Sequence, residues 1–153
     1  MRVRQTQRSR RMGEHKLFFD DVSEGDTAPP FAHELTRTDL VAYAGASGDF
    51  NPMHHDEVQA MAAGLPSVFG HGMFTMGLLG KALTDYVGVG NLERYSVRFT
   101  QQTWPGEMLT TQVSIARKFD QDGAHKVELA CAVVNQDGAA KVQGTAVAVL
   151  PAR

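Results

Sequence analysis

The sequence predicts a single α+β domain in which one long central helix is wrapped by a curved antiparallel β-sheet. Two observations carry this prediction: residues 72–86 are apolar almost throughout, and the hydrophobic period changes to strict alternation from about residue 95 onward. A chain of 153 residues, 42% of them hydrophobic, can bury one core but is short for two. One helix packed on a curved sheet is the simplest way to cover both apolar surfaces.

The N-terminal segment is strongly basic. Five arginines lie within the first eleven residues, so removing them leaves ten basic against seventeen acidic residues, a net charge of about −7. We expect residues 1–12 to be a disordered basic leader and residues 13–153 to form the domain. An RNA-binding or targeting arm is the alternative for the leader, but it lacks the apolar centre of a signal peptide. Met12 would also serve as a start, in which case residues 1–11 are not part of the native protein.

Residues 16–35 predict a short strand at 16–19, a connection rich in glycine and proline, and a second extended piece. Thr36 and Asp39 then form a capping-box pattern, which predicts a helix over residues 37–46. This helix delivers the chain to Asp49.

Two further helices follow. Residues 57–63 predict a short helix that ends at Gly64, and residues 72–86 predict a buried helix because apolar side chains occur nearly all the way round it. Gly77 and Gly80 inside the second helix cost helix stability, so we expect another group to approach the backbone closely there.

The remaining third of the chain predicts an antiparallel meander of four long strands. Apolar and polar residues alternate in each of them, and Pro-Gly or Asp-Gly pairs separate them as hairpin turns. The strands are expected near residues 95–100, 109–115, 127–133 and 142–150, with turns at Pro105-Gly106, Asp122-Gly123 and Asp137-Gly138.

The stretch Asp-Phe-Asn-Pro-Met-His at residues 49–54 places an acid and a base five residues apart. Pro52 prevents a regular element and pushes Asn51 toward extended geometry, so the segment should turn and bring Asp49 and His54 toward each other. The pair then suits acid–base chemistry on a shared water. The alternative is structural: the composition is typical of turns, and either side chain could cap the helix that begins near Asp56.

Several segments together resemble the MaoC-like (R)-specific enoyl-thioester hydratases and dehydratases. They are YAGASGDFNPMH at residues 43–54, FGHGMFTMG at 69–77, VRFT at 97–100 and PGE at 105–107. The resemblance spans residues from about 14 to 150. It implies the hot-dog fold, a central helix wrapped by an antiparallel sheet, which agrees with the fold class inferred above.

The resemblance also implies roles for individual residues. Asp49 and His54 would hold the water that adds to, or leaves from, C3 of the acyl chain, with His54 as the main proton carrier. Asn51 would organise the loop or hydrogen-bond one of the pair. Gly72 takes the position of the oxyanion donor, whose free N–H at a helix N-terminus would polarise the thioester carbonyl. A simple glycine at a helix start is the alternative for Gly72.

The neighbours of Gly72 are further candidates. His71 would cap or orient the start of the buried helix, and Met73 would help to shape the acyl pocket. The chain departs from the family at Gly80, where some members carry a hydroxyl residue.

Other chemistries find less support. His55 and Asp56 adjoin the pair, but neighbouring side chains on an extended loop point apart, so we expect no metal site. Cys131, the single cysteine, lies in an alternating stretch and is expected to be a core thiol. No Gly-x-Ser-x-Gly elbow surrounds Ser47, and neither a phosphate loop nor a dinucleotide fingerprint is present.

The resemblance implies reversible hydration of trans-2-enoyl thioesters to (R)-3-hydroxyacyl thioesters in fatty-acid or polyketide-type metabolism, without a metal or redox cofactor. The substrate would be carried on coenzyme A or an acyl carrier protein. A hot-dog thioesterase and a non-catalytic acyl-binding subunit of a heterodimeric dehydratase are the alternatives. We expect a cytoplasmic homodimer, or a heterodimer with a second hot-dog subunit, that binds neither nucleic acid nor membrane.

Overall fold

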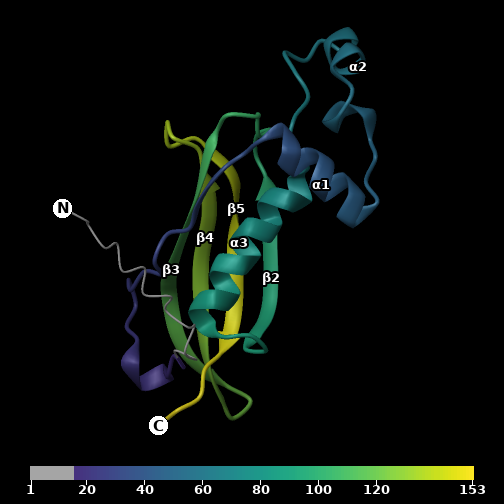
Figure 1. Ribbon diagram of the computed structural model, residues 1–153. Helices are drawn as coiled ribbons and strands as arrows, with labels where there is room; N and C mark the ends of the chain where they lie inside the picture. Colours follow the sequence, from purple (N-terminus) through teal and green to yellow (C-terminus); the bar gives the residue numbers. More distant parts are fainter. Residues whose placement is uncertain (1–15) are drawn as a thin grey trace, which may run out of the picture.

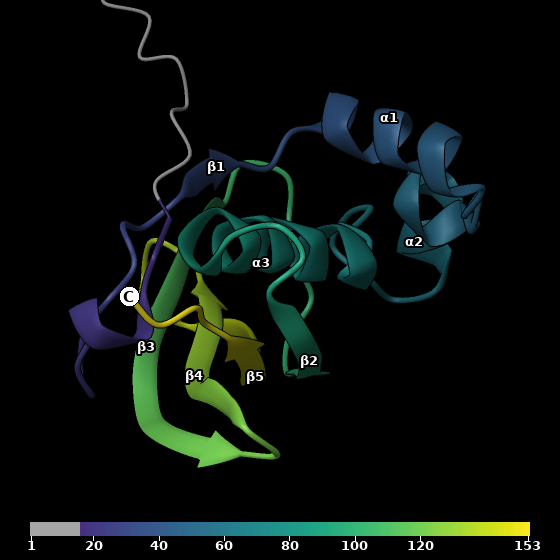
Figure 2. The same cartoon turned by 90° about the horizontal axis from the view of Figure 1, so that it is seen from below.

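The central feature of the fold is helix α3, Gly72–Val87, held against the concave face of a five-stranded antiparallel sheet (Figures 1 and 2). The computed structural model describes residues 16–153, so the predicted leader at residues 1–12 lies outside the described residues. The predicted α+β class, with one central helix and a curved antiparallel sheet, is confirmed.

The sheet has the order β1-β3-β4-β5-β2. Every neighbouring pair is antiparallel. The strands are β1 (Ala32–Glu34), β2 (Leu92–Phe99), β3 (Met108–Gln121), β4 (Ala124–Val134) and β5 (Ala140–Val149). Strands β3, β4 and β5 form a meander, three of the four strands predicted for it. The two-residue turn between β3 and β4 places both Asp122 and Gly123 at positive φ, as a type I′ turn requires. This turn type matches the right-handed twist of the two strands that it joins.

The predicted hairpin at Pro105-Gly106 is wrong. Strand β2 pairs with β5 and not with β3, so residues 100–107 cross from the edge strand β2 to β3, which lies next to the opposite edge. Two hydrogen bonds fix this crossing: the Thr100 N–H donates to the Lys141 carbonyl at 2.9 Å, and the Gly70 N–H donates to the Thr103 carbonyl at 2.8 Å. Hydrophobic alternation identifies a strand but does not specify which neighbour it will choose.

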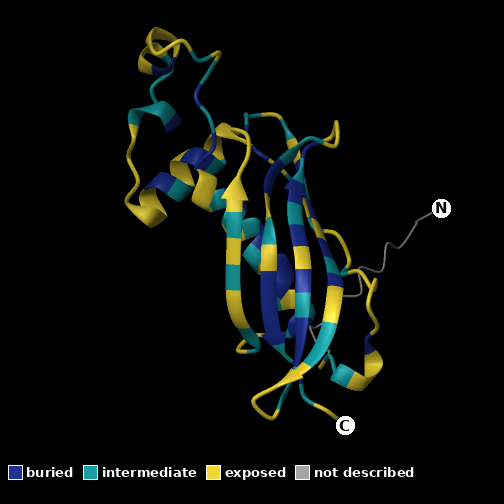
Figure 3. Ribbon diagram, turned by 180° about the vertical axis from the view of Figure 1, so that it is seen from behind, coloured by how far each residue is buried: buried dark blue, intermediate teal, exposed yellow. Residues whose placement is uncertain are grey.

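The prediction that α3 is buried all round is also wrong within this chain. One face packs on the sheet through Leu79, Leu83 and Val87, each fully buried. The opposite face is exposed and carries an ion pair between Lys81 and Asp85. The core therefore lies between one face of α3 and the alternating inward residues of the sheet, while the outward residues form exposed stripes on its back (Figure 3).

The two helix glycines differ in their surroundings. The ring of Tyr95 approaches within 3.6 Å of where a Cβ of Gly80 would lie, and the Tyr95 hydroxyl donates to the Met76 carbonyl at 2.9 Å. This agrees with the expected close approach. Within the described residues nothing comes within 4 Å of the corresponding point on Gly77.

The predicted strand at residues 16–19 is wrong. Residues 16–18 are irregular, and Phe19–Asp21 forms a single 3₁₀ turn, η1. The Phe19 ring stacks on His125, while the Lys118 ammonium lies over the same ring and donates to the Phe19 carbonyl at 2.7 Å. These side-chain contacts, rather than strand pairing, fasten the segment to the β3–β4 hairpin. The second predicted extended piece contains β1.

Helix α1, Arg37–Ser47, and helix α2, Glu57–Ala62, project beyond one end of the sheet (Figures 1 and 2). The predicted capping box is present, because Asp39 N–H donates to the Thr36 hydroxyl and Thr36 N–H to the Asp39 carboxylate. Both predicted helix ranges agree with the structure to within one residue. Among residues 16–153, every helix is too short or too polar to cross a bilayer.

Candidate active site

Asp49 lies in a tight loop immediately after α1. The helix ends at Gly48, whose φ of 75° is the left-handed conformation that glycine adopts readily. The Asp49 N–H donates to the Ser47 hydroxyl at 3.2 Å, and one Asp49 carboxylate oxygen accepts from the Asn51 N–H at 3.2 Å. The loop is therefore organised by local polar contacts. The second carboxylate oxygen makes none of these contacts and lies 4.0 Å from the His54 Nε2, and 51% of the side chain is exposed.

His54 follows on a 3₁₀ turn, η2, Pro52–His54. Pro52 occupies its first position, where the missing N–H costs nothing, and the Asn51 side-chain oxygen accepts from the Met53 N–H at 3.1 Å. Asn51 thus organises the loop through its neighbour's backbone. The predicted turn between residues 49 and 54 is present.

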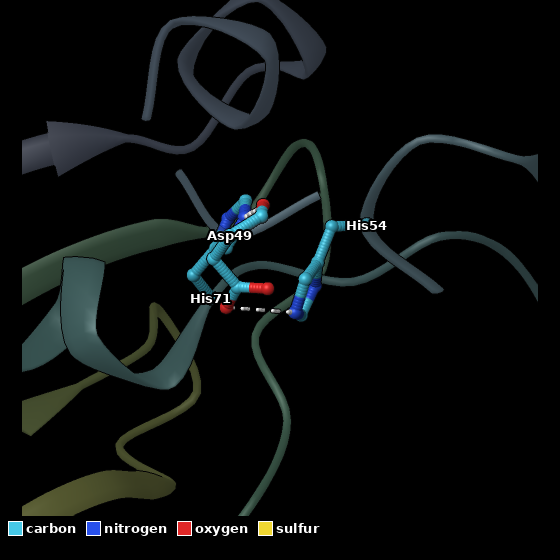
Figure 4. A group of neighbouring side chains, drawn as sticks. All are labelled: Asp49, His54 and His71. Atoms are coloured by element: carbon cyan, nitrogen blue, oxygen red, sulfur yellow. Dashed lines mark hydrogen bonds and ion pairs between the residues drawn. The ribbon is translucent and has the colours of Figure 1, made fainter. Parts of the chain in front are cut away.

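The protonation pattern of His54 follows from its hydrogen bond. Its Nδ1 lies 2.7 Å from the Phe69 carbonyl oxygen, which can only accept, so Nδ1 carries the proton in the neutral ring. The lone pair is then on Nε2, which lies 4.0 Å from a carboxylate oxygen of Asp49 (Figure 4). The side chain is only 8% exposed. A buried base therefore lies beside a half-exposed acid, at a separation that one water can bridge by hydrogen bonds to both.

His71 completes the group (Figure 4). Its Nε2–H donates to the main-chain carbonyl of Asp49 at 3.1 Å, and its ring stacks on that of His54 with centroids 3.8 Å apart and planes 28° from parallel. Tyr43 packs on the ring as well, at 4.9 Å. His71 is 1% exposed, and burial lowers its pKa below the ordinary value because the charged imidazolium would lose its hydration.

Gly72 begins α3 directly after His71. In the described part of the chain neither its N–H nor that of Met73 donates to the backbone, as expected in the first turn of a helix. The Phe99 ring lies 3.1 Å from where a Cβ of Gly72 would be, so a larger residue would crowd it. A hollow of about 260 Å³ opens here, lined by Gly72, Thr75, Phe99 and Thr103 among others.

Asp49, His54 and His71 each offer one ligand atom within 4.8 Å of the others, a grouping that could hold a metal ion. The ring geometry is unfavourable for it. Imidazole binds metals in the plane of its ring, and two nearly parallel stacked rings do not direct their in-plane lone pairs at one point. The His71 Nε2 is also engaged with the Asp49 carbonyl.

The remaining candidates lie around this group. His55 is exposed and its Nε2–H donates to the Phe50 carbonyl at 3.1 Å, so it takes no part in the cluster. Helix α2 is capped by Asp56, which accepts from the Gln59 N–H at 3.1 Å. The alternative that Asp49 or His54 caps this helix is therefore wrong. Met73 is 56% exposed beside Gly72. Cys131 is buried in the core as expected, which raises the pKa of its thiol to about 11.

The sequence did not identify two groups that the structure places at the site. The Phe69 carbonyl fixes the His54 tautomer, and the Phe99 ring covers Gly72. The role of the Phe69 carbonyl could not be predicted from the sequence, because every residue has a backbone carbonyl. Phe99 looks like any apolar residue of an alternating strand.

A second, larger hollow of about 970 Å³ lies on the outer side of the sheet. Small and polar side chains line it, and Arg98 is the one charged residue among them. It contains no acid–base pair.

The chain is similar in sequence and in fold to known proteins of one family. The family model described as MaoC like domain matches residues 23–136, well over half of the chain. The chain is 27% identical over 138 residues to the (R)-specific enoyl-CoA hydratase of Rhodospirillum rubrum, covering 89% of this chain and 93% of that protein. It is 40% identical over 82 residues to the peroxisomal hydratase-dehydrogenase-epimerase of Saccharomyces cerevisiae, covering 53% of this chain but 9% of that protein.

The solved structure of R-hydratase PhaJ1 from Pseudomonas aeruginosa, in the unliganded form, superposes with a TM-score of 0.79 at 25% identity. The match covers 90% of this chain and 88% of that one. With a matching family model over residues 23–136 and the same architecture, the chain belongs to the MaoC-like family and has its hot-dog fold.

Proposed function

We propose that this protein catalyses the reversible hydration of trans-2-enoyl thioesters to (R)-3-hydroxyacyl thioesters. The observation that carries the proposal is the pairing of the Asp49 carboxylate with the unprotonated Nε2 of His54 at 4.0 Å, next to the N-terminus of α3. The R. rubrum relative is named an (R)-specific enoyl-CoA hydratase, which supports the same reaction here.

The pair supplies the water. A water bonded to both the Asp49 oxygen and His54 Nε2 is held with a lone pair free to attack C3 of the enoyl chain. As the O–C3 bond forms, the water proton passes to Nε2, and the imidazolium is stabilised by the nearby carboxylate. His54 then returns a proton to C2, so that the elements of one water are added across the double bond. Dehydration is the same path reversed.

The N-terminus of α3 supplies the second half of the site. Attack at C3 moves charge onto the thioester oxygen, and the Gly72 N–H, aligned with the positive end of the helix dipole, can stabilise that oxyanion. The absence of a side chain at Gly72 leaves space for the carbonyl to approach under the Phe99 ring.

The proposed substrate carrier is coenzyme A or an acyl carrier protein, and the chemistry as proposed requires neither a metal nor a redox cofactor. The hydratase mechanism assigns a role to each group of the site, since the water, the base and the oxyanion donor are all accounted for.

Crotonyl-CoA tests the proposal directly. We expect the enoyl absorbance to fall on addition of the protein, with no release of free thiol and with formation of the (R)-3-hydroxybutyryl thioester. Release of thiol in step with substrate loss would instead identify a thioesterase and contradict the proposed reaction.

We further propose that the active form is a dimer joined through β2. This strand pairs with β5 on one side only, so its other side offers unpaired backbone donors and acceptors to a second chain. Large apolar side chains are also exposed beside the site: Phe50 next to Asp49 at 63%, Met73 at 56% and Phe99 at 52%. Their burial by a second subunit or by an acyl chain would lower the free energy of the assembly.

A second copy of this chain and a different hot-dog subunit are both compatible with that edge. Purified chain that is inert alone but gains hydratase activity when a second hot-dog subunit is added would identify the partner as heterologous.

A further inference from the structure

The three working parts of the proposed site come from three separate segments. Asp49 is on the loop after α1, His54 on η2, and Gly72 at the start of α3. His71 touches all three: it hydrogen-bonds the Asp49 main chain, stacks on the His54 ring, and precedes Gly72 in the chain as the N-cap residue.

We propose that His71 is a positioning residue for the hydration reaction, whose Nε2–H holds the Asp49 backbone so that the carboxylate stays beside His54. The His71 ring also stacks on the His54 ring, but the positioning role proposed here belongs to the hydrogen bond. This inference rests on the proposed function and assigns to His71 a role that acts through Asp49.

The hydrogen bond requires one particular protonation state of His71. Because the Asp49 carbonyl can only accept, the proton is on Nε2, and Nδ1 is left as a buried acceptor with no partner among the described residues. A side chain used only to cap α3 would not explain this arrangement, because His71 makes no side-chain bond to the helix N–H groups.

The groups that face His71 favour the neutral ring. These are the carboxylate and main-chain carbonyl of Asp49, the His54 ring and Tyr43, while the charge of His55 acts on His71 from outside the cluster. Burial and the neighbouring imidazoles disfavour the charged form more than the half-exposed Asp49 carboxylate favours it. The lowered pKa of His71 therefore favours the neutral ring that donates from Nε2 to the Asp49 carbonyl.

Two substitutions separate the two contacts of His71. His71→Gln keeps an N–H donor at nearly the same distance from the backbone but removes the aromatic ring. His71→Phe keeps a flat ring against His54 but removes the donor. His55 supplies matched controls, because its Nε2–H also donates to a carbonyl of the same loop while its ring lies outside the cluster.

The kinetic test uses both variants with crotonyl-CoA, after circular dichroism and thermal melts show which of them fold. We expect His71→Phe to lower kcat by about tenfold or more, as loss of an orienting contact of about 1.4 kcal/mol would, with KM changed by less than about threefold. His71→Gln should stay within about threefold of the wild type, and so should His55→Gln and His55→Phe.

A double-mutant cycle tests whether His71 acts through Asp49. In the Asp49→Asn background, adding His71→Phe should lower kcat by less than about twofold further, because the group being positioned is already disabled. Full multiplication of the two losses would overturn the inference. Equal losses in His71→Phe and His71→Gln, or wild-type kcat in His71→Phe, would overturn it too.

A measurement without substrate separates this inference from the proposed function. Amide hydrogen exchange over residues 49–54 should be faster in His71→Phe than in the wild type, and close to the wild type in His71→Gln and in both His55 variants. If the wild type hydrates no enoyl thioester but this exchange pattern is seen, the proposed function fails and the positioning role stands. Unchanged exchange in His71→Phe would contradict the positioning role whatever the substrate.

Discussion

At the scale of single residues, the contrast between Asp49 and His54 matters most. The base is nearly buried with its Nδ1 proton committed to the Phe69 carbonyl, whereas half of the acid side chain is open to solvent. Such a base keeps one orientation and one tautomer, so its single free lone pair always faces the same place. The half-exposed carboxylate can orient a water through the oxygen that does not accept from the Asn51 N–H.

Substitution of either member should therefore cost activity and leave the fold intact. We expect Asp49→Asn and His54→Ala each to lower kcat with crotonyl-CoA by on the order of 100-fold or more, which is typical of a lost acid or base. His55→Ala, at the adjacent exposed histidine, should remain near the wild type. Thermal melts and circular dichroism check the fold; a variant at Asp49 or His54 with wild-type turnover would contradict the assignment.

The sequence predicts much of this local arrangement, since Pro52 forces the turn that brings residues 49 and 54 together. It does not predict that His71 stacks on His54. That contact depends on how residues 65–71, which follow α2, pack against the turn at residues 52–54. The Phe69 N–H fixes this packing by donating to the Met53 carbonyl at 3.2 Å. Both partners of this hydrogen bond are backbone groups, which nearly all residue types carry, so the sequence does not reveal it.

At the scale of elements, the capping box of α1 and the glycine that follows α2, Gly64, are readable from the sequence because both signals are local. The partner of β2 is not. Gly144 on β5 is the residue that allows this pairing: a Cβ there would lie 2.0 Å from the Ser96 carbonyl oxygen and 2.7 Å from the Val97 Cα. The sequence shows only a glycine within a strand. The reason that a side chain is excluded there becomes clear only from the position of β2 in the structure.

Gly144→Ala should consequently destabilise the fold. The added methyl meets the backbone of β2, which cannot move aside as a flexible side chain can, so we expect a loss of about 1–3 kcal/mol or more in the free energy of unfolding. Gly45→Ala is the matched control, because nothing lies within 4 Å of that position on α1 and alanine favours a helix by about 0.5–1 kcal/mol. Urea denaturation measures both; a Gly144→Ala midpoint at or above that of the wild type would show that β2 tolerates the methyl group.

At the scale of the whole molecule, the two edges of the sheet differ in length, and one face of α3 is not covered by the rest of the described chain. The sheet ends at β1, three residues long, on one edge and at β2, eight residues long, on the other. Helix α3 leaves its outer face, including Met73 and Gly77, uncovered. The prediction that this helix is buried all round errs because apolar composition does not distinguish surfaces covered within a chain from those covered by another.

We expect sedimentation equilibrium at assay concentrations to give the mass of two chains. The β2 amides that do not bond to β5 should then exchange slowly with solvent, and faster as dilution separates the subunits. A fully active species with the mass of one chain would contradict the dimer proposal.

The pairing of β2 with β5 also sets an order of events during synthesis. Leu92 lies opposite Ala148, and Phe99 opposite Val142, so β2 leaves the ribosome dozens of residues before its partner exists. Until then β2 has no partner strand, and α3 has no complete sheet to pack against. The loop of residues 49–54 is made early, but the proposed site is complete only after β5 has formed, so gain of the proposed hydratase activity during refolding should report the pairing of β2 with β5.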